Sequence, residues 1–403
     1  MKMKHLLSLI LACILCISLI ACNKTSKDPL DTGVATPENN GVEETTPEEE
    51  TTTSEEETTA EPGPQIVTKT YNFTEILDKV KVSGRMSTST LGLELDHTAA
   101  GVEFNAYIEG SLTVTVNIAK GGSDSVNDNC YFTLYIDGVK SETRFKALNG
   151  INTTFDLANF SEGGVHNIRL VKQTEAKNAL CTFKTVSFTG YFETKPVDAA
   201  HYVEFLGDSI TVGYGNLIAN GGSNAGMAAN QDATQAFAYL AAQKLKADYS
   251  MVAVSGIGVV KGYRTNTMKT YFEANSLYRS TTVKYEPTRI PDLVVINLGT
   301  NDENNNVSLT DWQAGVSELV TQIRTKYGKN VPIVWVYNMM SVSPYYPQYA
   351  KKALDALGGE AAGLYMCKLV HNKEGGGNHP NLAAHATASE ELVTFIQSKN
   401  ILK

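Results

Sequence analysis

Four short polar clusters hold the residues whose types could do chemistry. Between them they contain a serine, several glycines, an asparagine and a histidine, and they span residues 207–215, 255–258, 299–302 and 378–381. A serine hydroxyl is a weak nucleophile at neutral pH unless a base accepts its proton, and histidine is the most common base. Ser209 and His379 are therefore the candidate nucleophile and general base.

The segments around these clusters alternate between strand and helix patterns from His201 onward. Strands are predicted at 202–206, 250–254, 293–298 and 333–337, and helices at 233–247, 310–327, 348–357 and 382–398. Alternating strands and helices indicate a parallel sheet covered by helices on both faces. Sites in such sheets lie outside the carboxyl ends of the strands, which is where three of the four clusters fall. The fourth cluster directly precedes the last helix.

An all-β region precedes this α/β region. Apolar and polar residues alternate at 111–118, 131–136, 165–171 and 181–188, and Asp137-Gly138 is a tight-turn pair. Short strands at this spacing favour a β-sandwich with a jelly-roll topology. The predicted organisation is a signal segment at 1–22, an acidic linker at 23–64, a β-domain at 65–196 and an α/β domain at 197–403. A fold of the β-domain type does not by itself give a function.

Taken together and in order, Ser209, Gly256, Asn301 and His379 resemble the motif residues of the SGNH branch of the GDSL hydrolases. The resemblance covers about residues 202–400 and implies a three-layer α/β hydrolase domain. It also implies that the backbone N–H groups of Ser209 and Gly256 and the side-chain amide of Asn301 stabilise the oxyanion of a tetrahedral intermediate. Gly258 is the competing candidate for the second of these donors.

The sequence departs from that family at the position three residues before His379. Most members have an aspartate there, which orients the imidazole, whereas this chain has Gly376. Either a loop carbonyl accepts the Nδ1 proton, which gives a Ser–His dyad, or Glu374 takes the place of the acid. We expect the dyad. The missing acid is also the only support for a protein that has lost its activity.

The whole folded region is similar to the family 2 carbohydrate esterases, which place a jelly-roll domain before an SGNH domain. The similar segments are 84–85, 135–138, 166–172 with 174–175, 207–215, 255–258 and 333–340. The resemblance implies removal of acetyl groups from plant polysaccharides such as xylan and mannan or glucomannan, with the sugar O6 as one candidate position. The alternatives are an esterase for another acyl ester, such as O-acetylated peptidoglycan or a small ester, and a non-catalytic carbohydrate-binding surface protein.

Aromatic side chains near the clusters are candidates for stacking on a sugar ring, although aromatic residues in strands and helices usually belong to the core. The candidates are Trp335, Tyr337, Trp312 and Tyr214, with Tyr263 close by. The sequence has no metal-ligand spacing and no phosphate-binding glycine loop followed by lysine. We therefore expect neither a metal nor a cofactor, and we expect a monomer.

The N-terminus predicts export and a lipid anchor. Lys2 and Lys4 precede an apolar stretch at 6–21, and Leu19-Ile-Ala-Cys22 resembles the end of a bacterial lipoprotein signal. That resemblance implies lipidation of Cys22 and a protein anchored to the cell membrane and facing outside. An ordinary secretory signal or an N-terminal membrane helix is the alternative. The apolar stretch is the only one near membrane length, which excludes a polytopic membrane protein.

The net charge of −9 is unevenly distributed along the 403 residues. Residues 23–63 contain twelve acidic residues and two lysines, and their Thr/Glu/Pro-rich composition predicts a disordered stalk. Residues 64–403 contain 31 acidic and 30 basic residues, so no basic field is present to bind nucleic acid. Cys130 and Cys181 could form a disulfide in an exported protein, but with Cys367 they could equally be three buried thiols.

Overall fold

The computed structural model describes residues 63–121, 129–276 and 278–403. The predicted signal segment, Cys22 and the linker up to residue 62 lie outside the described residues. Within the described part, no helix is long and apolar enough to cross a membrane.

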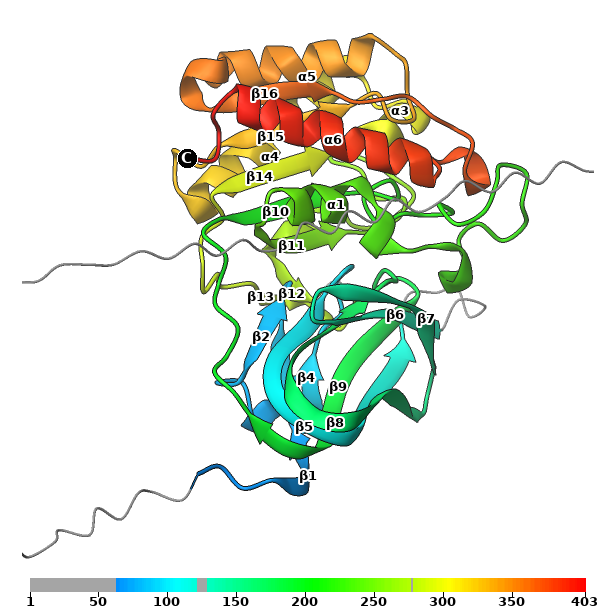
Figure 1. Cartoon of the computed structure of the whole chain (residues 1–403). Helices are drawn as coiled ribbons and strands as arrows, with labels where there is room; N and C mark the ends of the chain where they lie inside the picture. Colours follow the sequence, from blue (N-terminus) through cyan, green and yellow to red (C-terminus); the bar gives the residue numbers. More distant parts are fainter. Residues whose placement is uncertain (1–62, 122–128, 277) are drawn as a thin grey trace, which may run out of the picture. The chain divides into compact units, whose positions relative to one another are not determined.

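The first folded part is the predicted β-rich domain, shown in blue to green in Figure 1. Its antiparallel sheet has the strand order β3-β4-β9-β5-β8-β6-β7, while β1 pairs with β9 and β2 with β5. The strands are β1 (Val67–Asn72), β2 (Val80–Ser83), β3 (Ser87–Ser89), β4 (Gly92–Glu94), β5 (Gly101–Lys120), β6 (Asn129–Ile136), β7 (Val139–Leu148), β8 (Asn152–Lys172) and β9 (Ala179–Phe192). The four predicted strands lie within β5, β6, β8 and β9. The jelly-roll topology stays a prediction.

Three long strands dominate this domain because apolar residues alternate along them. In β5 nearly every second side chain is buried, and these side chains enter one core with Phe132, Phe183 and Phe188. Register shifts in the pairing of β5 with β8 and β9 accompany the strong curvature of the sheet visible in Figure 1. The predicted turn joins β6 to β7, with positive φ at both Asp137 and Gly138.

The second folded part contains a five-stranded parallel sheet with the order β11-β10-β14-β15-β16. Its strands are β10 (Tyr202–Gly207), β11 (Asp248–Ala253), β14 (Leu293–Asn297), β15 (Ile333–Tyr337) and β16 (Leu364–Lys368). The helices are α1 (Phe237–Lys244), α2 (Met268–Glu273), α3 (Thr300–Asn304), α4 (Leu309–Tyr327), α5 (Tyr345–Ala356) and α6 (Leu382–Ser398). Between α2 and β14 in the sequence, β12 (Ala274–Ser276) and β13 (Ser280–Lys284) form an antiparallel β-hairpin.

Alternate residues of the parallel strands enter two different hydrophobic cores. Leu206, Ile296 and Trp335 pack in one core with residues of α2, α4 and α5. Phe205, Val295 and Val334 pack in the other with residues of α1 and α6. Because successive side chains of a strand point to opposite faces, this division buries both faces of the sheet.

The predicted helix at 233–247 begins with a separate turn. Ala233–Gln235 forms a 3-10 turn, and the Asp232 side chain accepts a hydrogen bond from Thr234 N, as an N-cap does. The α-helix itself starts at Phe237.

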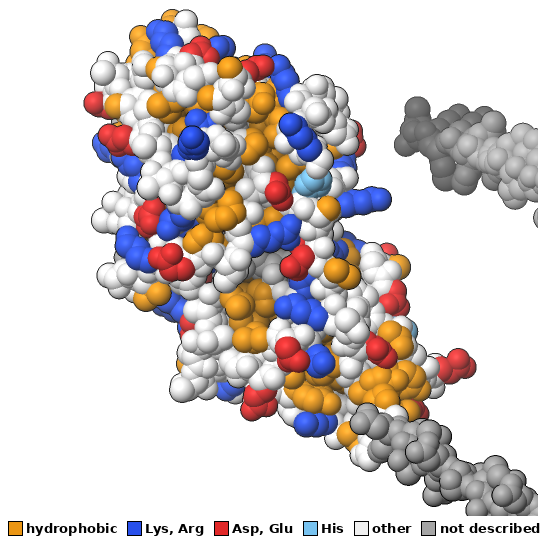
Figure 2. Space-filling view, turned by 90° about the vertical axis from the view of Figure 1, so that its left-hand side faces the viewer, with side chains coloured by type: hydrophobic (Ala, Val, Ile, Leu, Met, Phe, Trp, Pro, Cys, Tyr) orange, Lys and Arg blue, Asp and Glu red, His pale blue; other side chains and the backbone are white. Residues whose placement is uncertain are grey.

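Strand β16, helices α2 and α3 and the hairpin β12–β13 were not predicted from the sequence. The face shown in Figure 2 has acidic and basic side chains interspersed among apolar ones.

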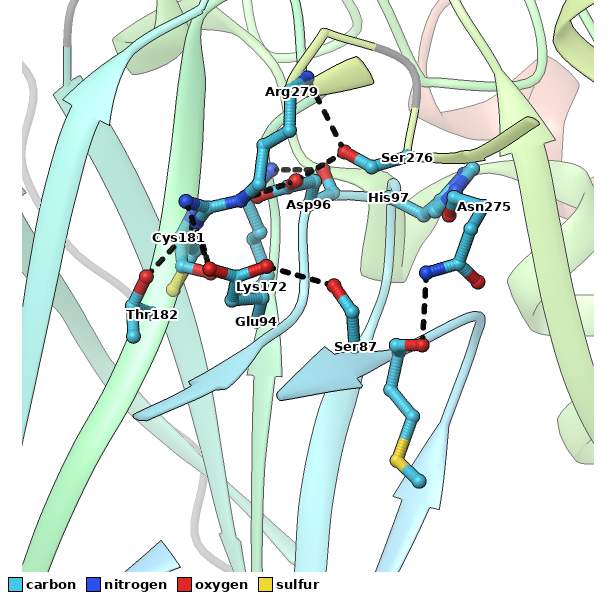
Figure 3. Close-up of polar contacts among 11 residues, drawn as sticks. Ser87, Glu94, Asp96, His97, Lys172, Cys181, Thr182, Asn275, Ser276 and Arg279 are labelled. Carbon is cyan, nitrogen blue, oxygen red and sulfur yellow. Dashed lines mark hydrogen bonds and ion pairs between the residues drawn. The ribbon is translucent and has the colours of Figure 1, made fainter. Parts of the chain in front are cut away.

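Buried polar contacts join the β-domain to the α/β domain. Arg85 forms a fully buried ion pair with Glu204 of β10 at 3.1 Å. A second cluster, shown in Figure 3, joins Asp96 to the hairpin β12–β13: its carboxylate accepts from Arg279 Nε at 2.8 Å and from the Ser276 hydroxyl. Asn275 Nδ2 donates to Met86 O at 3.0 Å in the same cluster. The two domains are thus linked by specific side-chain contacts.

Candidate active site

Ser209 lies directly after β10, in the turn that leaves the carboxyl end of the strand. The turn is tight because the Asp208 carboxylate accepts from Ile210 N at 3.0 Å and Tyr214 N donates to Ser209 O at 3.0 Å. Gly207 makes the turn possible, since a Cβ at this position would collide with the Thr211 hydroxyl. The Ser209 side chain is mostly buried but lines an open cavity.

His379 reaches Ser209 from the loop that precedes α6. Its Nε2 lies 2.8 Å from Ser209 Oγ, and its Nδ1 lies 2.9 Å from the carbonyl oxygen of Gly377. A carbonyl can only accept, so Nδ1 carries the proton and Nε2 is free to accept the proton of Ser209. Burial lowers the pKa of His379 to about 4, which keeps the imidazole unprotonated at neutral pH, with Nε2 able to accept a proton.

Glu374 does not contact His379. Its carboxylate accepts from the side chains of Asn372 at 3.0 Å and Asn381 at 2.8 Å. The loop is held in place by Gly376 N, which donates to Gly215 O at 2.9 Å. Of the two sequence alternatives, the contacts therefore match the loop carbonyl and not Glu374.

Neighbouring side chains leave no space for an aspartate side chain at Gly376. A Cβ at Gly376 would lie 2.6 Å from Ile218 Cγ1 and 3.0 Å from Ala225 Cβ. Neither distance leaves room for a carboxylate without movement of the neighbouring loop. The absence of the acid thus goes together with a loop packing that has no place for it.

Gly256 lines the same cavity as Ser209 and His379, whereas Gly258 does not. Gly256 has φ +84°, a conformation that favours glycine. Among the described residues, no protein acceptor is found for the backbone N–H of Ser209 or of Gly256. Both groups are therefore available to an oxyanion, and Gly256 fits the second donor position better than Gly258.

The side-chain amide of Asn301 is already occupied. Its Nδ2 donates to Ile257 O at 2.8 Å and lies 3.2 Å from Asp208 Oδ2. For Asn301 to donate to an oxyanion, the longer contact to Asp208 would have to open. Burial raises the pKa of Asp208 to about 7, so this carboxyl is partly protonated near neutral pH and a weaker acceptor than a carboxylate.

Two carboxylates hold the loop that contains Gly256. Glu175, from the β-domain, accepts from Ser255 N at 2.7 Å and from Ser255 Oγ at 2.6 Å. Asp302 of α3 accepts from Val259 N at 2.9 Å, Val260 N at 2.7 Å and Lys261 N at 3.0 Å. Burial raises the pKa of Asp302, although these three N–H groups favour its charged form.

The cavity has a volume of about 700 Å³ and is lined by residues of all four polar clusters. Of the residues that the structure describes, three basic ones, Lys177, Arg264 and Lys373, also line it, and no Asp or Glu does. Lys177 comes from the β-domain, so both domains contribute to the cavity wall. None of these three residues was predicted from the sequence to belong to the site. The only available signal was the position of Lys177 two residues after the Thr174-Glu175 pair.

The predicted aromatic contacts are only partly in the cavity. Trp312 and Trp335 are each about 1% exposed, and their indole N–H groups donate to Tyr346 O and Leu298 O. They pack against each other in the core with ring centroids 5.7 Å apart, so their assignment to substrate binding was wrong. Tyr337 lines other clefts, next to Asn338, and is not in the wall of this cavity.

Tyr214 does line the cavity, with its ring 4.4 Å from that of His379. Tyr263 also lines it and is 64% exposed. These are the two aromatic side chains that a sugar entering the cavity could meet.

Within the described ranges, no group of His, Cys, Asp and Glu side chains could hold a metal ion. Cys130, Cys181 and Cys367 are all buried free thiols. Of the two sequence alternatives for these cysteines, the structure therefore has the thiols and not the disulfide.

Both folded parts match known protein families. Residues 205–386 match the GDSL-like Lipase/Acylhydrolase family, and residues 82–196 match the Carbohydrate esterase 2 N-terminal family.

Two relatives of known name share parts of the sequence. The cellulase/esterase CelE of Acetivibrio thermocellus is 24% identical over 320 residues, which are 75% of this chain and 37% of the relative. An acetylxylan esterase / glucomannan deacetylase of Cellvibrio japonicus is 32% identical over 154 residues, which are 34% of this chain and 40% of the relative. This chain therefore spans well under two thirds of the length of either relative.

Solved structures show the same fold over most of the described residues. A family two carbohydrate esterase from Clostridium thermocellum in complex with cellohexaose has a TM-score of 0.72 and 24% identity, covering 80% of this chain and 99% of the other. An acetyl xylan esterase from Butyrivibrio proteoclasticus has a TM-score of 0.73 and 22% identity, covering 84% of this chain and all of the other.

Proposed function

We propose that this protein is a carboxylic ester hydrolase. Residues 205–386 match the GDSL-like Lipase/Acylhydrolase family, and residues 82–196 match the Carbohydrate esterase 2 N-terminal family. Its substrates would be O-acetyl groups on plant polysaccharides, namely xylan and mannan or glucomannan. The name of the Cellvibrio japonicus relative supports an acetylated polysaccharide as the substrate. The observation that carries the proposal is the 2.8 Å contact between His379 Nε2 and Ser209 Oγ in the wall of an open cavity.

The reaction would be a double displacement by a Ser–His dyad. Ser209 Oγ attacks the acetyl carbonyl carbon while His379 Nε2 takes its proton. His379 then gives that proton to the sugar oxygen as its bond to the carbonyl carbon breaks, so that the sugar leaves with a free hydroxyl. Water attacks the acetyl-serine with His379 again as base, which releases acetate and restores Ser209. The Gly377 carbonyl holds the Nδ1 proton throughout. The backbone N–H groups of Ser209 and Gly256 stabilise each oxyanion.

Two alternatives have less support. A non-catalytic binding protein would not need Ser209 and His379 in hydrogen-bond contact, yet they are 2.8 Å apart. An esterase for another acyl ester, such as O-acetylated peptidoglycan or a small ester, would be favoured by a cavity without exposed aromatic side chains, yet Tyr263 is 64% exposed there. The first observation favours an enzyme over a binding protein, and the second favours a substrate that contains a sugar over a small ester.

The protein would act outside the cell as a monomer, with the membrane reached through a lipid on Cys22 and with no cofactor or nucleic acid involved. Support for the anchor comes from the sequence of residues 1–22 alone. The acidic linker would then separate the two folded domains from the membrane surface.

The test is acetate release from acetylated xylan and acetylated glucomannan by the chain from residue 23 onward, which lacks the anchor cysteine. The expected result is release that falls by roughly 10³-fold or more in Ser209→Ala, because the nucleophile is lost. Thr68→Ala, an exposed substitution on β1, serves as the control and should keep full activity. A folded wild-type chain that releases no acetate from either polymer or from a small aryl acetate would refute the esterase.

A further inference from the structure

The β-domain reaches the active site through one short connection. Residues 173–178, between β8 and β9, are all buried, and Glu175 in this connection is 0% exposed. Its carboxylate accepts both the backbone N–H and the hydroxyl of Ser255, at 2.7 and 2.6 Å. Lys177 Nζ lies 3.6 Å from the same carboxylate and lines the cavity. A pair of opposite charges from one domain is therefore buried against the catalytic loop of the other.

The connection is itself fixed by buried polar contacts. Lys172 Nζ, at the end of β8, donates to Thr174 O at 2.7 Å and to Asp96 O at 2.9 Å. The Asp96 carboxylate is in turn bound by Arg279, as Figure 3 shows. Because each group is held by the next, Glu175 has little freedom to move away from Ser255.

The bonds to Ser255 set the direction of the predicted oxyanion donor. The N–H of Gly256 belongs to the planar peptide group whose carbonyl is that of Ser255. Arg264 Nε donates to this carbonyl at 2.7 Å, while Glu175 holds the N–H and the side chain of the same residue. With its carbonyl fixed on one side, the peptide must present the Gly256 N–H on the other.

The same pair of charges acts on His379. The charged and titratable groups around it are Glu175 and Lys177 from the β-domain, Lys373 and Arg264 on the cavity wall, Tyr214 with its ring 4.4 Å away, and His385 of α6. Burial lowers the pKa of His379, whereas the charge of Glu175 raises it and that of Lys177 lowers it. Nδ1 is bonded to the Gly377 carbonyl and to no carboxylate of the described ranges, so Glu175 supplies negative charge through space to the imidazolium that forms during the reaction.

We propose that Glu175 of the β-domain is a positioning residue of the hydrolase site. It orients the Ser255–Gly256 peptide that donates to the oxyanion, and its charge compensates in part for the acid missing at Gly376. The β-domain then contributes directly to the catalytic centre of the α/β domain. This inference rests on the esterase activity proposed above.

The test compares Glu175→Gln, Lys177→Met and the double variant, with kcat and KM measured for an aryl acetate from about pH 3.5 to pH 8. Glu175→Gln keeps the size of the side chain but removes its charge. We expect kcat to fall by roughly 10- to 100-fold with little change in KM, because the donor loses its alignment. The acid limb of kcat/KM should move to lower pH in Glu175→Gln and to higher pH in Lys177→Met. The double variant should recover part of the loss, because no unpaired lysine charge remains.

Glu162→Gln, an exposed substitution in β8 of the same domain, is the matched control and should behave as wild type. Wild-type kcat and an unmoved acid limb in Glu175→Gln would overturn the inference, and so would an equal loss at every pH without recovery in the double variant. If Glu175→Gln does not fold, the inference is tested with Lys177→Met alone. An acid limb of kcat/KM at higher pH than in the wild type supports the inference, and an unchanged acid limb overturns it. An inactive wild type would count against the esterase itself, which separates the two failures.

Discussion

At the scale of single residues, His379 is bonded to a carbonyl in place of a carboxylate, and its Nε2 can still act as a base. The Gly377 carbonyl fixes its tautomer as well as an aspartate would, but it carries no charge to stabilise the imidazolium. In the proposed reaction, the cost of the missing acid would therefore fall on the transition state and not on the resting geometry. A neutral imidazole remains correctly placed over a wide range of pH.

The pH dependence follows from the lowered pKa of His379. Burial disfavours the charged imidazolium, so the pKa of His379 falls to about 4. The imidazole is therefore mostly unprotonated at higher pH. We expect kcat/KM for an aryl acetate to be constant above about pH 5 and to fall tenfold per pH unit below about pH 4. Wild type and Glu162→Gln should give the same curve. An acid limb near pH 6.5, the ordinary value for histidine, would contradict the effect of burial.

Gly376 offers a direct test of whether the acid can simply be restored. In Gly376→Asp the new Cβ would lie 2.6 Å from Ile218 Cγ1, so the loop must shift and His379 with it. We expect lower activity, and a free energy of unfolding lower by about 1–3 kcal/mol in urea denaturation. Adding Ile218→Ala should recover part of the activity by making room. A single variant more active than wild type would show that the loop accepts an aspartate after all.

At the scale of elements, short α3 and its neighbouring loop depend on one buried carboxylate. Asp302 accepts three backbone N–H groups from residues 259–261, so Asp302→Asn replaces an acceptor oxygen with a donor facing those groups. We expect a loss of about 1–3 kcal/mol in the free energy of unfolding, together with lower kcat. Asp311→Asn, in the exposed first turn of α4, should cost under about 1 kcal/mol. Equal losses in the two variants would remove the special role of Asp302.

The sequence periods predicted the elements that are long or fully apolar. Strands β10, β11, β14 and β15 and helices α4 and α6 appear close to the predicted residues, because each contributes an uninterrupted apolar face. Strand β16 was missed because Leu364–Lys368 mixes exposed and buried side chains at the edge of the sheet. Helix α3 and the hairpin β12–β13 are too short for any period to show.

The site was predicted where local motifs determine it and missed where distant contacts do. Ser209, Gly256 and His379 share one cavity because each follows or precedes a predictable element. Trp335 was misassigned because strand position alone does not say which face a side chain joins. Glu175 was not assigned a role, since its partner Ser255 is 80 residues away and only the packing of two domains brings them together.

At the scale of the whole molecule, the two domains share buried charges. Arg85 of the β-domain donates to Glu204 of β10 and also to Phe272 O at 2.7 Å and Ala274 O at 2.8 Å. Its guanidinium lies 3.8 Å from the centre of the Tyr285 ring. Tyr327 donates to the other Glu204 oxygen at 2.7 Å. Separating the domains would expose or unpair all of these groups at once, so we expect the domains to unfold together.

Urea denaturation followed by two signals tests this coupling. Both tryptophans, Trp312 and Trp335, belong to the α/β domain, whereas far-ultraviolet circular dichroism reports on both domains. The two transitions should coincide in the wild type, because separating the domains would leave Arg85 and Glu204 without their buried partners. Glu204→Gln leaves Arg85 buried without a counter-ion and should lower the free energy of unfolding by about 3–5 kcal/mol. Lys351→Gln breaks an exposed ion pair and should cost under about 0.5 kcal/mol. Transitions that separate already in the wild type would show two independent domains, and the β-domain could then not hold the catalytic loop through Glu175 in the way its contacts indicate.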